Sequence, residues 1–137
     1  MSAVEIIEHG GLRYAIIVRD ARPDGRVKFF TPDDAPLQIG AFNMKGGEEI
    51  QPHIHKTVER KLQLTTEVLI IQQGRLQVDF YDPQKNPIDK CELAAGDVIL
   101  LLEGAHGFRV SEDLKMLEIK QGPYAGEMDK ERFNRPL

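Results

Sequence analysis

The sequence predicts an antiparallel all-β fold, either a barrel or a sandwich. Apolar and β-branched residues come in short bursts bounded by turn residues, and no stretch of about 10–15 residues between them has helical periodicity. Within one burst, Leu76, Val78 and Phe80 alternate with polar residues, as in a strand with one core face and one wetter face. Short strands at close spacing without intervening helices favour antiparallel pairing over an α/β fold.

The expected strands follow these bursts, and they are Arg13–Arg19, Val27–Phe30, Leu37–Met44, Ile50–His55, Glu67–Gln73, Leu76–Tyr81, Ile88–Leu93, Val98–Leu102, His106–Val110 and Leu114–Lys120. Turn residues separate them at Arg22–Gly25, Lys45–Gly47, Gln73–Gly74, Asp82–Pro83, Asn86–Pro87 and Ala95–Asp97. Two segments do not fit a strand. Lys56–Thr66 is typical of a polar loop, and Glu127–Asn134 is expected to form at most a short C-terminal helix.

The composition indicates a single globular domain spanning residues 1–137. Hydrophobic residues make up 41% and charged residues 29%, a balance that argues against general disorder. The 18 basic and 22 acidic residues give a net charge of −4, so no basic surplus exists for binding nucleic acid. The longest apolar run, Val98–Leu102, is far shorter than the roughly 20 residues that span a bilayer, so no membrane partner is expected.

The cysteine count and the N-terminus predict a cytoplasmic location. Cys91 is the only cysteine, which excludes an intramolecular disulfide and suits a reducing compartment. The N-terminus carries Glu5 and Glu8 where a signal peptide has a basic start and an apolar stretch.

Two histidines form a candidate chelating pair. Side chains two residues apart on a strand point to the same face, so His53 and His55 should project together, with Gln51 beside them. Two converging imidazoles are half of a metal site. The alternative is a histidine pair on a solvated strand face.

A carboxylate and a third histidine add to this pair. Glu67 begins a strand whose inward row would be Glu67, Leu69 and Ile71, and a buried carboxylate is unfavourable unless it is paired or coordinates a cation. His106 opens another strand, with Phe108 and Val110 on its own face. The alternatives are a surface charge at a strand edge for Glu67 and a hydrogen-bonded core histidine for His106.

The spacing of these residues from glycines resembles the two motifs of the cupin superfamily. In the first motif, five residues separate Gly47 from His53-Ile54-His55, and six residues separate Glu67 from Gly74. In the second, Gly96 is followed after five residues by Leu102-Glu103-Gly104-Ala105-His106, with Leu102 in place of the family's proline. The resemblance covers Gly47 to about Val110. The gap of 11 residues between His55 and Glu67 is longer than the family's usual gap.

The resemblance implies a jelly-roll barrel, or double-stranded β-helix, with a core at about residues 37–120 and a tail at 121–137. It implies that one divalent transition metal is held by His53, His55, Glu67 and His106. Glu59 follows His55 at the family's usual short distance, but Glu67 keeps the spacing to Gly74 and is preferred. The resemblance also implies a homodimer, with the tail packed either across the partner subunit or on its own barrel.

Three imidazoles and one carboxylate suit Zn, Fe, Mn, Ni or Cu, and this donor set does not choose among them. Four protein ligands leave about two positions of a six-coordinate metal open to water, dioxygen or a small-molecule ligand. The candidate pocket residues around the metal are Gln51, Leu69, Ile71, Phe108 and Val110. Charges in the loop Lys56–Thr66, at Lys56, Arg60 and Lys61, are placed to meet an anionic substrate.

The leading functional hypothesis is a small metalloenzyme of dioxygenase or isomerase type that acts on a small polar or anionic molecule, possibly sugar-linked. One alternative is a noncatalytic module that binds a small molecule or sugar. Another is a metal-free sugar-nucleotide isomerase or epimerase, which a pocket with a histidine–carboxylate pair and a catalytic tyrosine would favour and an intact set of four metal ligands would count against. The individual catalytic residues stay unassigned.

Overall fold

The computed structural model describes residues 4–23 and 25–136, which form two compact units. Unit 1 combines the N-terminal segment up to Ala21 with the chain from Leu64 onward, and unit 2 is the segment from Arg22 to Gln63. The expectation of one domain stays a prediction. In the part of the chain that the structure describes, no helix has the length and apolar character needed to cross a membrane.

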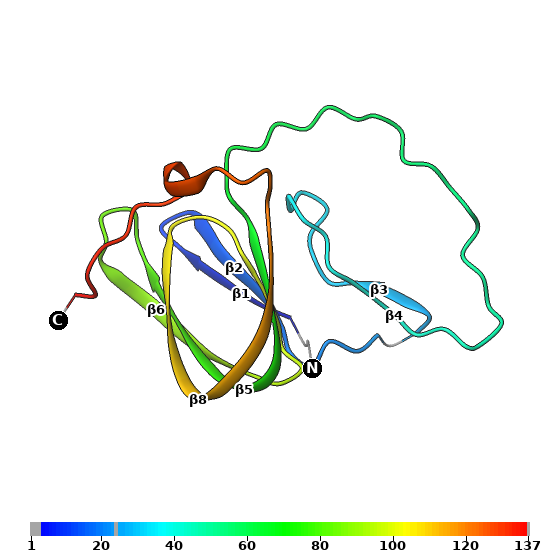
Figure 1. The fold of residues 1–137 in the computed structure, drawn as a ribbon, viewed down its shortest axis with the longest axis horizontal. Helices are drawn as coiled ribbons and strands as arrows, with labels where there is room; N and C mark the ends of the chain where they lie inside the picture. Colours follow the sequence, from blue (N-terminus) through cyan, green and yellow to red (C-terminus); the bar gives the residue numbers. More distant parts are fainter. Residues whose placement is uncertain (1–3, 24, 137) are drawn as a thin grey trace. The chain divides into compact units, whose positions relative to one another are not determined.

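Unit 1 is a single curled antiparallel sheet, which confirms the all-β class (Figure 1). Its strands are β1 (Val4–His9), β2 (Leu12–Val18), β5 (Glu67–Tyr81), β6 (Pro87–Ala94), β7 (Val98–Leu101) and β8 (Ala105–Lys120). They follow the order β1-β2-β7-β5-β6, and β8 pairs with β5 along the other edge of that strand. The 3-10 helix η1 (Gly126–Asp129) comes after the last strand.

The two longest strands, β5 and β8, bend together at Gly74. Their register shifts repeatedly between Ile71 and Leu76, as at β-bulges, and Figure 1 shows both strands turning back at the same place. Gly74 has a φ of +86°, which favours glycine, and a Cβ at this position would overlap the backbone oxygen of Asp113 on β8. Only glycine therefore allows the two backbones to approach this closely.

The bend folds the sheet over one hydrophobic core. Leu69 and Ile71 precede Gly74, whereas Leu76, Val78 and Phe80 follow it, and all five side chains belong to the same buried cluster. The rest of this cluster comes from β2, β6 and β7, and its members are Tyr14, Ala15, Ile17, Leu93, Ile99 and Leu101. The predicted core positions Leu76, Val78 and Phe80 are thereby confirmed, whereas Tyr81, which the alternation places on the wetter face, is also buried.

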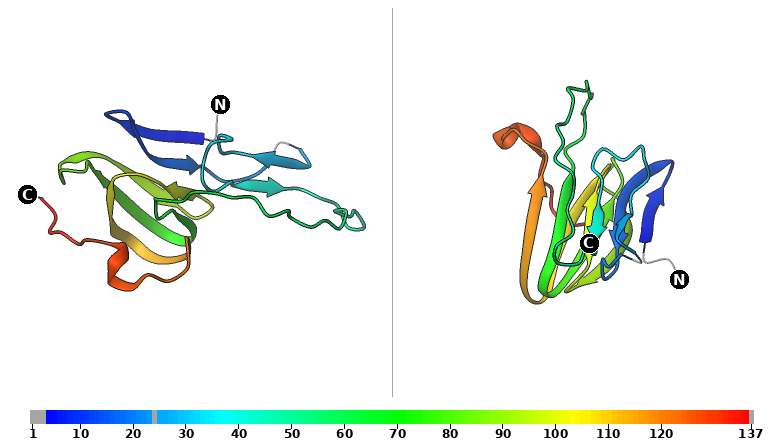
Figure 2. Two further views of the ribbon diagram at one scale, coloured as in Figure 1. Left: turned by 90° about the horizontal axis from the view of Figure 1, so that it is seen from above. Right: turned by 90° about the vertical axis from the view of Figure 1, so that its right-hand side faces the viewer.

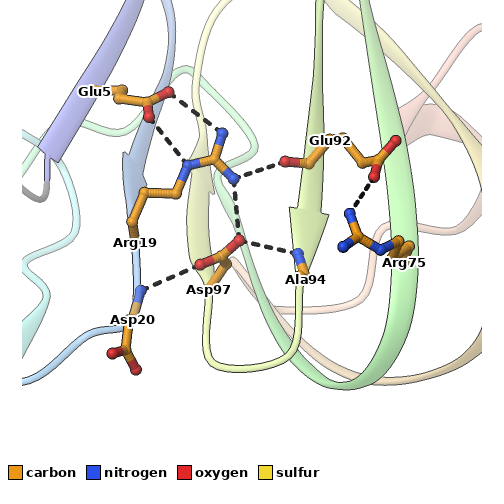
Figure 3. A network of polar contacts seen from close by, with 7 residues as sticks. All are labelled: Glu5, Arg19, Asp20, Arg75, Glu92, Ala94 and Asp97. Atoms are coloured by element: carbon orange, nitrogen blue, oxygen red, sulfur yellow. Dashed lines mark hydrogen bonds and ion pairs between the residues drawn. The ribbon is translucent and has the colours of Figure 1, made fainter.

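A buried carboxylate, Asp97, fixes the turn between β6 and β7 (Figure 3). Its Oδ2 accepts hydrogen bonds from the backbone N–H of Ala94 at 2.9 Å and from Arg19 Nη1 at 3.0 Å, and its Oδ1 accepts one from the N–H of Asp20 at 3.1 Å. Arg19 also donates to Glu5 on β1. The network therefore ties β1 and the end of β2 to the β6–β7 turn.

Unit 2 contains one small hairpin, in which β3 (Val27–Phe29) pairs with β4 (Gly40–Phe42). The rings of Phe29 and Phe42 pack edge to face across it, with centroids 6.3 Å apart. The predicted turn at Lys45–Gly47 is confirmed by a hydrogen bond from the N–H of Glu48 to the carbonyl of Lys45. Asp24, in the predicted turn at Arg22–Gly25, lies outside the described residues.

Several predicted elements differ from the structure. Ile50–His55 is not a strand, because no neighbouring strand pairs with it among the described residues and Pro52 lacks the N–H that a ladder needs. Gln73–Gly74 is a bulge inside β5 rather than a turn between two strands, and β8 likewise joins two predicted strands. β1 was not predicted, because its alternation is weak and its side chains are exposed or half-buried.

Within the predicted C-terminal helix Glu127–Asn134, only the start is helical. The 3-10 helix Gly126–Asp129 has no side-chain cap, and the chain continues in extended form from Lys130.

Substituting Gly74→Ala should destabilise the protein by about 3 kcal/mol or more, because it adds a steric overlap to an unfavourable left-handed φ. The matched control is Gly10→Ala, which has a φ of +56° but open space around the added Cβ, and should lose only about 1 kcal/mol. Chemical denaturation measures both values. Equal losses in the two variants would show that the contact with Asp113 does not constrain the bend.

Candidate functional site

The bend brings together two residues that lie near opposite ends of the β5–β8 ladder. Glu67 begins β5 and pairs with Lys120, whereas His106 pairs with Phe80 toward the end of β5. Thirteen positions of a straight strand would place Glu67 and Phe80 about 43 Å apart. Instead, the Nε2 atom of His106 lies 3.8 Å from the Oε2 atom of Glu67. The pair therefore depends on the folding of the ladder onto itself.

Glu67 occupies the inward row that the sequence predicts. The residue is only 9% exposed and shares its row with Leu69 and Ile71, which are fully buried in the core. Glu59, the alternative carboxylate, is exposed in an irregular segment of unit 2. Of the two glutamates, only Glu67 is therefore a buried charge that needs a partner.

His106 is held beside this carboxylate by an aromatic neighbour. Its ring stacks on Phe108 with centroids 5.4 Å apart and an interplanar angle of 29°. The side chain of His106 is 25% exposed, so the pair lies at the edge of the core rather than within it. The separation of 3.8 Å from Glu67 is that of an ion pair and is too long for a direct hydrogen bond.

The neighbours of Glu67 favour its ionised form. His106 is the main cause, and it lowers the pKa of Glu67 to about 2, although burial acts in the opposite direction. Glu118 and Lys120, on the facing part of β8, lower it further. In turn, the hydrogen bond to Glu67 and its negative charge raise the pKa of Glu118. Glu67, whose pKa is lowered, thus interacts both with the His106 imidazole and with a second carboxyl group, Glu118, whose pKa is raised.

Sequence reasoning missed Glu118 and Lys120. Alternation within the predicted strand Leu114–Lys120 places both on the face of Met116, which packs against the core. Their position beside Glu67 follows from the register of β8 on β5, in which Leu69 pairs with Glu118 and Glu67 with Lys120. That register depends on the bulges at the bend, and the residue pattern does not predict where these bulges occur.

The other predicted pair, His53 and His55, lies in unit 2. Both side chains are exposed in an irregular segment, yet their rings remain neighbours, with centroids 5.2 Å apart. The Nδ1 atom of His53 lies 2.9 Å from the carbonyl oxygen of Gln51, which leaves its Nε2 outside that contact. The two imidazoles are thus adjacent without the strand that was expected to align them.

Two of the predicted metal ligands, Glu67 and His106, lie in unit 1, and the other two, His53 and His55, lie in unit 2. Within residues 4–23 and 25–136, no group of three or more His, Cys, Asp or Glu side chains is arranged to hold a metal ion. Among the predicted pocket residues, Leu69 and Ile71 are core residues and Phe108 packs against that core. Val110 is 61% exposed on β8, and Gln51 is exposed in unit 2.

The pKa of Glu67 predicts how the stability of the metal-free protein depends on pH. Because this pKa is lower in the folded than in the unfolded chain, ionised Glu67 stabilises the fold above pH 4.5. That stabilisation, on the order of 1 kcal/mol, should disappear as the pH falls from 4.5 toward about 2. Glu118, whose pKa is raised, contributes in the opposite direction and reduces the net change.

Urea denaturation of the metal-free protein between pH 2 and pH 6 measures this dependence. The Glu67→Gln variant should show a flatter curve than the parent protein, whereas the exposed control Glu59→Gln should keep the parent slope. An unchanged slope in Glu67→Gln would mean that His106 and Glu67 do not interact in solution.

No family model matches the chain, and neither a curated protein nor a solved structure is found to be similar to it. The cupin resemblance therefore stays a prediction from the motif spacing.

Proposed function

We propose that this chain is a cupin-type protein that binds one divalent transition metal. Glu67 and His106 would supply two ligands, and the sequence motif names His53 and His55 as the other two candidates. The observation that carries most weight is the approach of His106 Nε2 to the buried Glu67 carboxylate at 3.8 Å. The curled antiparallel sheet of unit 1 supports the jelly-roll architecture that the resemblance implies.

The residues present in unit 1 fit such an ion. A ligating carboxylate must be ionised, and the pKa of Glu67 is lowered to about 2. Bonds of about 2.1 Å allow two ligand atoms of one metal to lie up to about 4.2 Å apart, and the observed separation lies within that limit. Imidazole and carboxylate donors without thiolate suit Zn, Fe, Mn, Ni or Cu.

Such a metal, when bound, would polarise a carbonyl group or activate oxygen. The chain's own residues orient the ligands and attract the substrate. Phe108 fixes the ring of His106 by stacking, and Lys120, which pairs with Glu67 across the ladder, adds positive charge beside the carboxylate. A small polar or anionic molecule, transformed by dioxygenase or isomerase chemistry, is the proposed substrate.

The same geometry favours one alternative, a metal-free isomerase or epimerase. In unit 1, the His106 imidazole faces the Glu67 carboxylate directly, and Glu118 adds a second carboxyl group to the pair. An imidazole paired with a carboxylate can move a proton to and from a sugar carbon without a metal. Metal content and turnover distinguish the two proposals.

Elemental analysis of protein purified without an affinity tag tests the metal site. We expect about one equivalent of a transition metal in the parent protein, and a loss of metal affinity of more than about tenfold in His106→Ala and in Glu67→Gln. Glu59→Gln, on an exposed segment, should bind metal like the parent protein. Circular dichroism checks that each variant keeps its sheet.

Two results would contradict the metal site. Equal loss of metal from Glu59→Gln and Glu67→Gln would show that Glu67 is not the specific carboxylate ligand. A parent protein that carries no metal, gains none on addition of each candidate ion and still converts a sugar substrate would support the metal-free enzyme instead.

A further inference from the structure

The C-terminal tail of unit 1 crosses the end of the sheet that carries Glu67 and His106. It leaves β8 through Gln121, whose N–H donates to the carbonyl of Thr66 at 2.9 Å, and it then forms η1. Figures 1 and 2 show the tail running from the end of β8 back across the unit to the side of β6. Its contacts form two groups, one on each side of the bend in β5.

The first group of contacts lies at the Glu67 end of the ladder. The hydroxyl of Thr65, two residues before Glu67, donates to Asp129 Oδ1. The Oδ2 atom of Asp129 lies 3.5 Å from the Nζ atom of Lys120, the cross-strand partner of Glu67. The Asp129 carboxylate is only 13% exposed, so these contacts are partly shielded from water.

The second group lies at the His106 end. Arg135 Nη1 forms an ion pair with Asp79, which pairs across the ladder with Gly107, the neighbour of His106. Phe133 packs edge to face on Tyr81, with ring centroids 5.3 Å apart. Lys85, in the turn after β5, also contacts the tail: its Nζ atom lies 2.9 Å from Glu131 Oε1 and 5.6 Å from the centroid of the Phe133 ring.

We propose that residues 129–135 are a clasp that holds together the two arms of the bent β5–β8 ladder. In this proposal, which rests on the proposed function, Asp129 and Arg135 are positioning residues for Glu67 and His106. The two site residues lie on different arms, so their separation depends on how far the arms are closed. Gly74 sets the bend at one end of the arms, and the clasp fixes their other end.

The length of the clasp agrees with this role. Six residue steps of extended chain span up to about 20 Å, and two packed layers of sheet lie about 10 Å apart. The segment is therefore long enough to reach both arms. Its anchors combine a hydrogen bond, two ion pairs on partly buried carboxylates and an aromatic contact. Charged hydrogen bonds of this kind contribute more to stability than exposed ion pairs do.

The test compares full-length, metal-free proteins by hydrogen exchange. The clasp variants are Asp129→Asn, Arg135→Gln and the double variant. The matched control is Arg132→Gln, because Arg132 pairs with Glu127 inside the tail rather than with the sheet. We expect amide exchange to become about tenfold faster in the double variant at residues 65–69 and 104–109, with little change at residues 71–75 around the bend.

A second readout separates positioning from general stabilisation. Imidazole NMR resonances of His106 should shift in both single clasp variants toward those of Glu67→Gln, and Arg135→Lys should restore part of the shift lost in Arg135→Gln. The Arg132→Gln control should match the parent protein in both readouts. Metal affinity is measured separately. A protein that binds no metal would refute the metal site, and amide exchange and the His106 resonances would still test the clasp.

Three outcomes would overturn the clasp. The first is a set of clasp variants that match the control in exchange and in the His106 resonances. The second is faster exchange spread evenly over unit 1 with unchanged His106 resonances, which would give the tail a purely structural role. The third is a dimer whose tails bind the partner's sheet, detected by size-exclusion chromatography and by its loss in the double variant.

Discussion

The pairing of β5 with β8 is the constraint on which the rest of unit 1 depends. Three strands, β6, β7 and β8, all pair with the single strand β5. Because β5 bends at Gly74, one continuous ladder supplies both layers around the core. The candidate site is a consequence of this arrangement, since Glu67 and His106 approach each other only where the two arms of the ladder face one another.

Two buried carboxylates show how the same fold uses charge in different ways. Asp97 accepts hydrogen bonds from two backbone N–H groups and from Arg19, so its partners are fixed by the β6–β7 turn and by β2. Glu67 instead faces the His106 imidazole and the Glu118 carboxyl group. The first environment stabilises a turn. The second leaves an ionised oxygen beside an imidazole, which is the arrangement that ligation or proton transfer requires.

Local patterns in the sequence identify the strands that bury one face. Alternation predicts the inward side chains of β5, including Glu67, and the turn residues of Asp82–Pro83 and Ala95–Asp97 mark where β5 and β6 end. The same reasoning fails at Gly74, because a glycine in a bulge and a glycine in a turn look alike along the chain. It also fails for Ile50–His55, where alternation exists but the structure provides no pairing partner among the described residues.

In the candidate site, too, some features follow from the local sequence and others depend on contacts between distant residues. That His53 and His55 are neighbours follows from their spacing alone, and they remain neighbours even without a strand. Other features depend on the register across a bent ladder: the contact of Glu67 with His106, the position of Lys120 and the contacts of the tail. Both His106 and Lys120 lie 39 residues or more from Glu67 in the sequence. A motif can therefore name the ligands, but the ladder determines which side chains surround them. If the proposed function holds, those surrounding groups would govern substrate charge and proton transfer, so Glu118, Lys120 and the tail would matter as much as the motif itself.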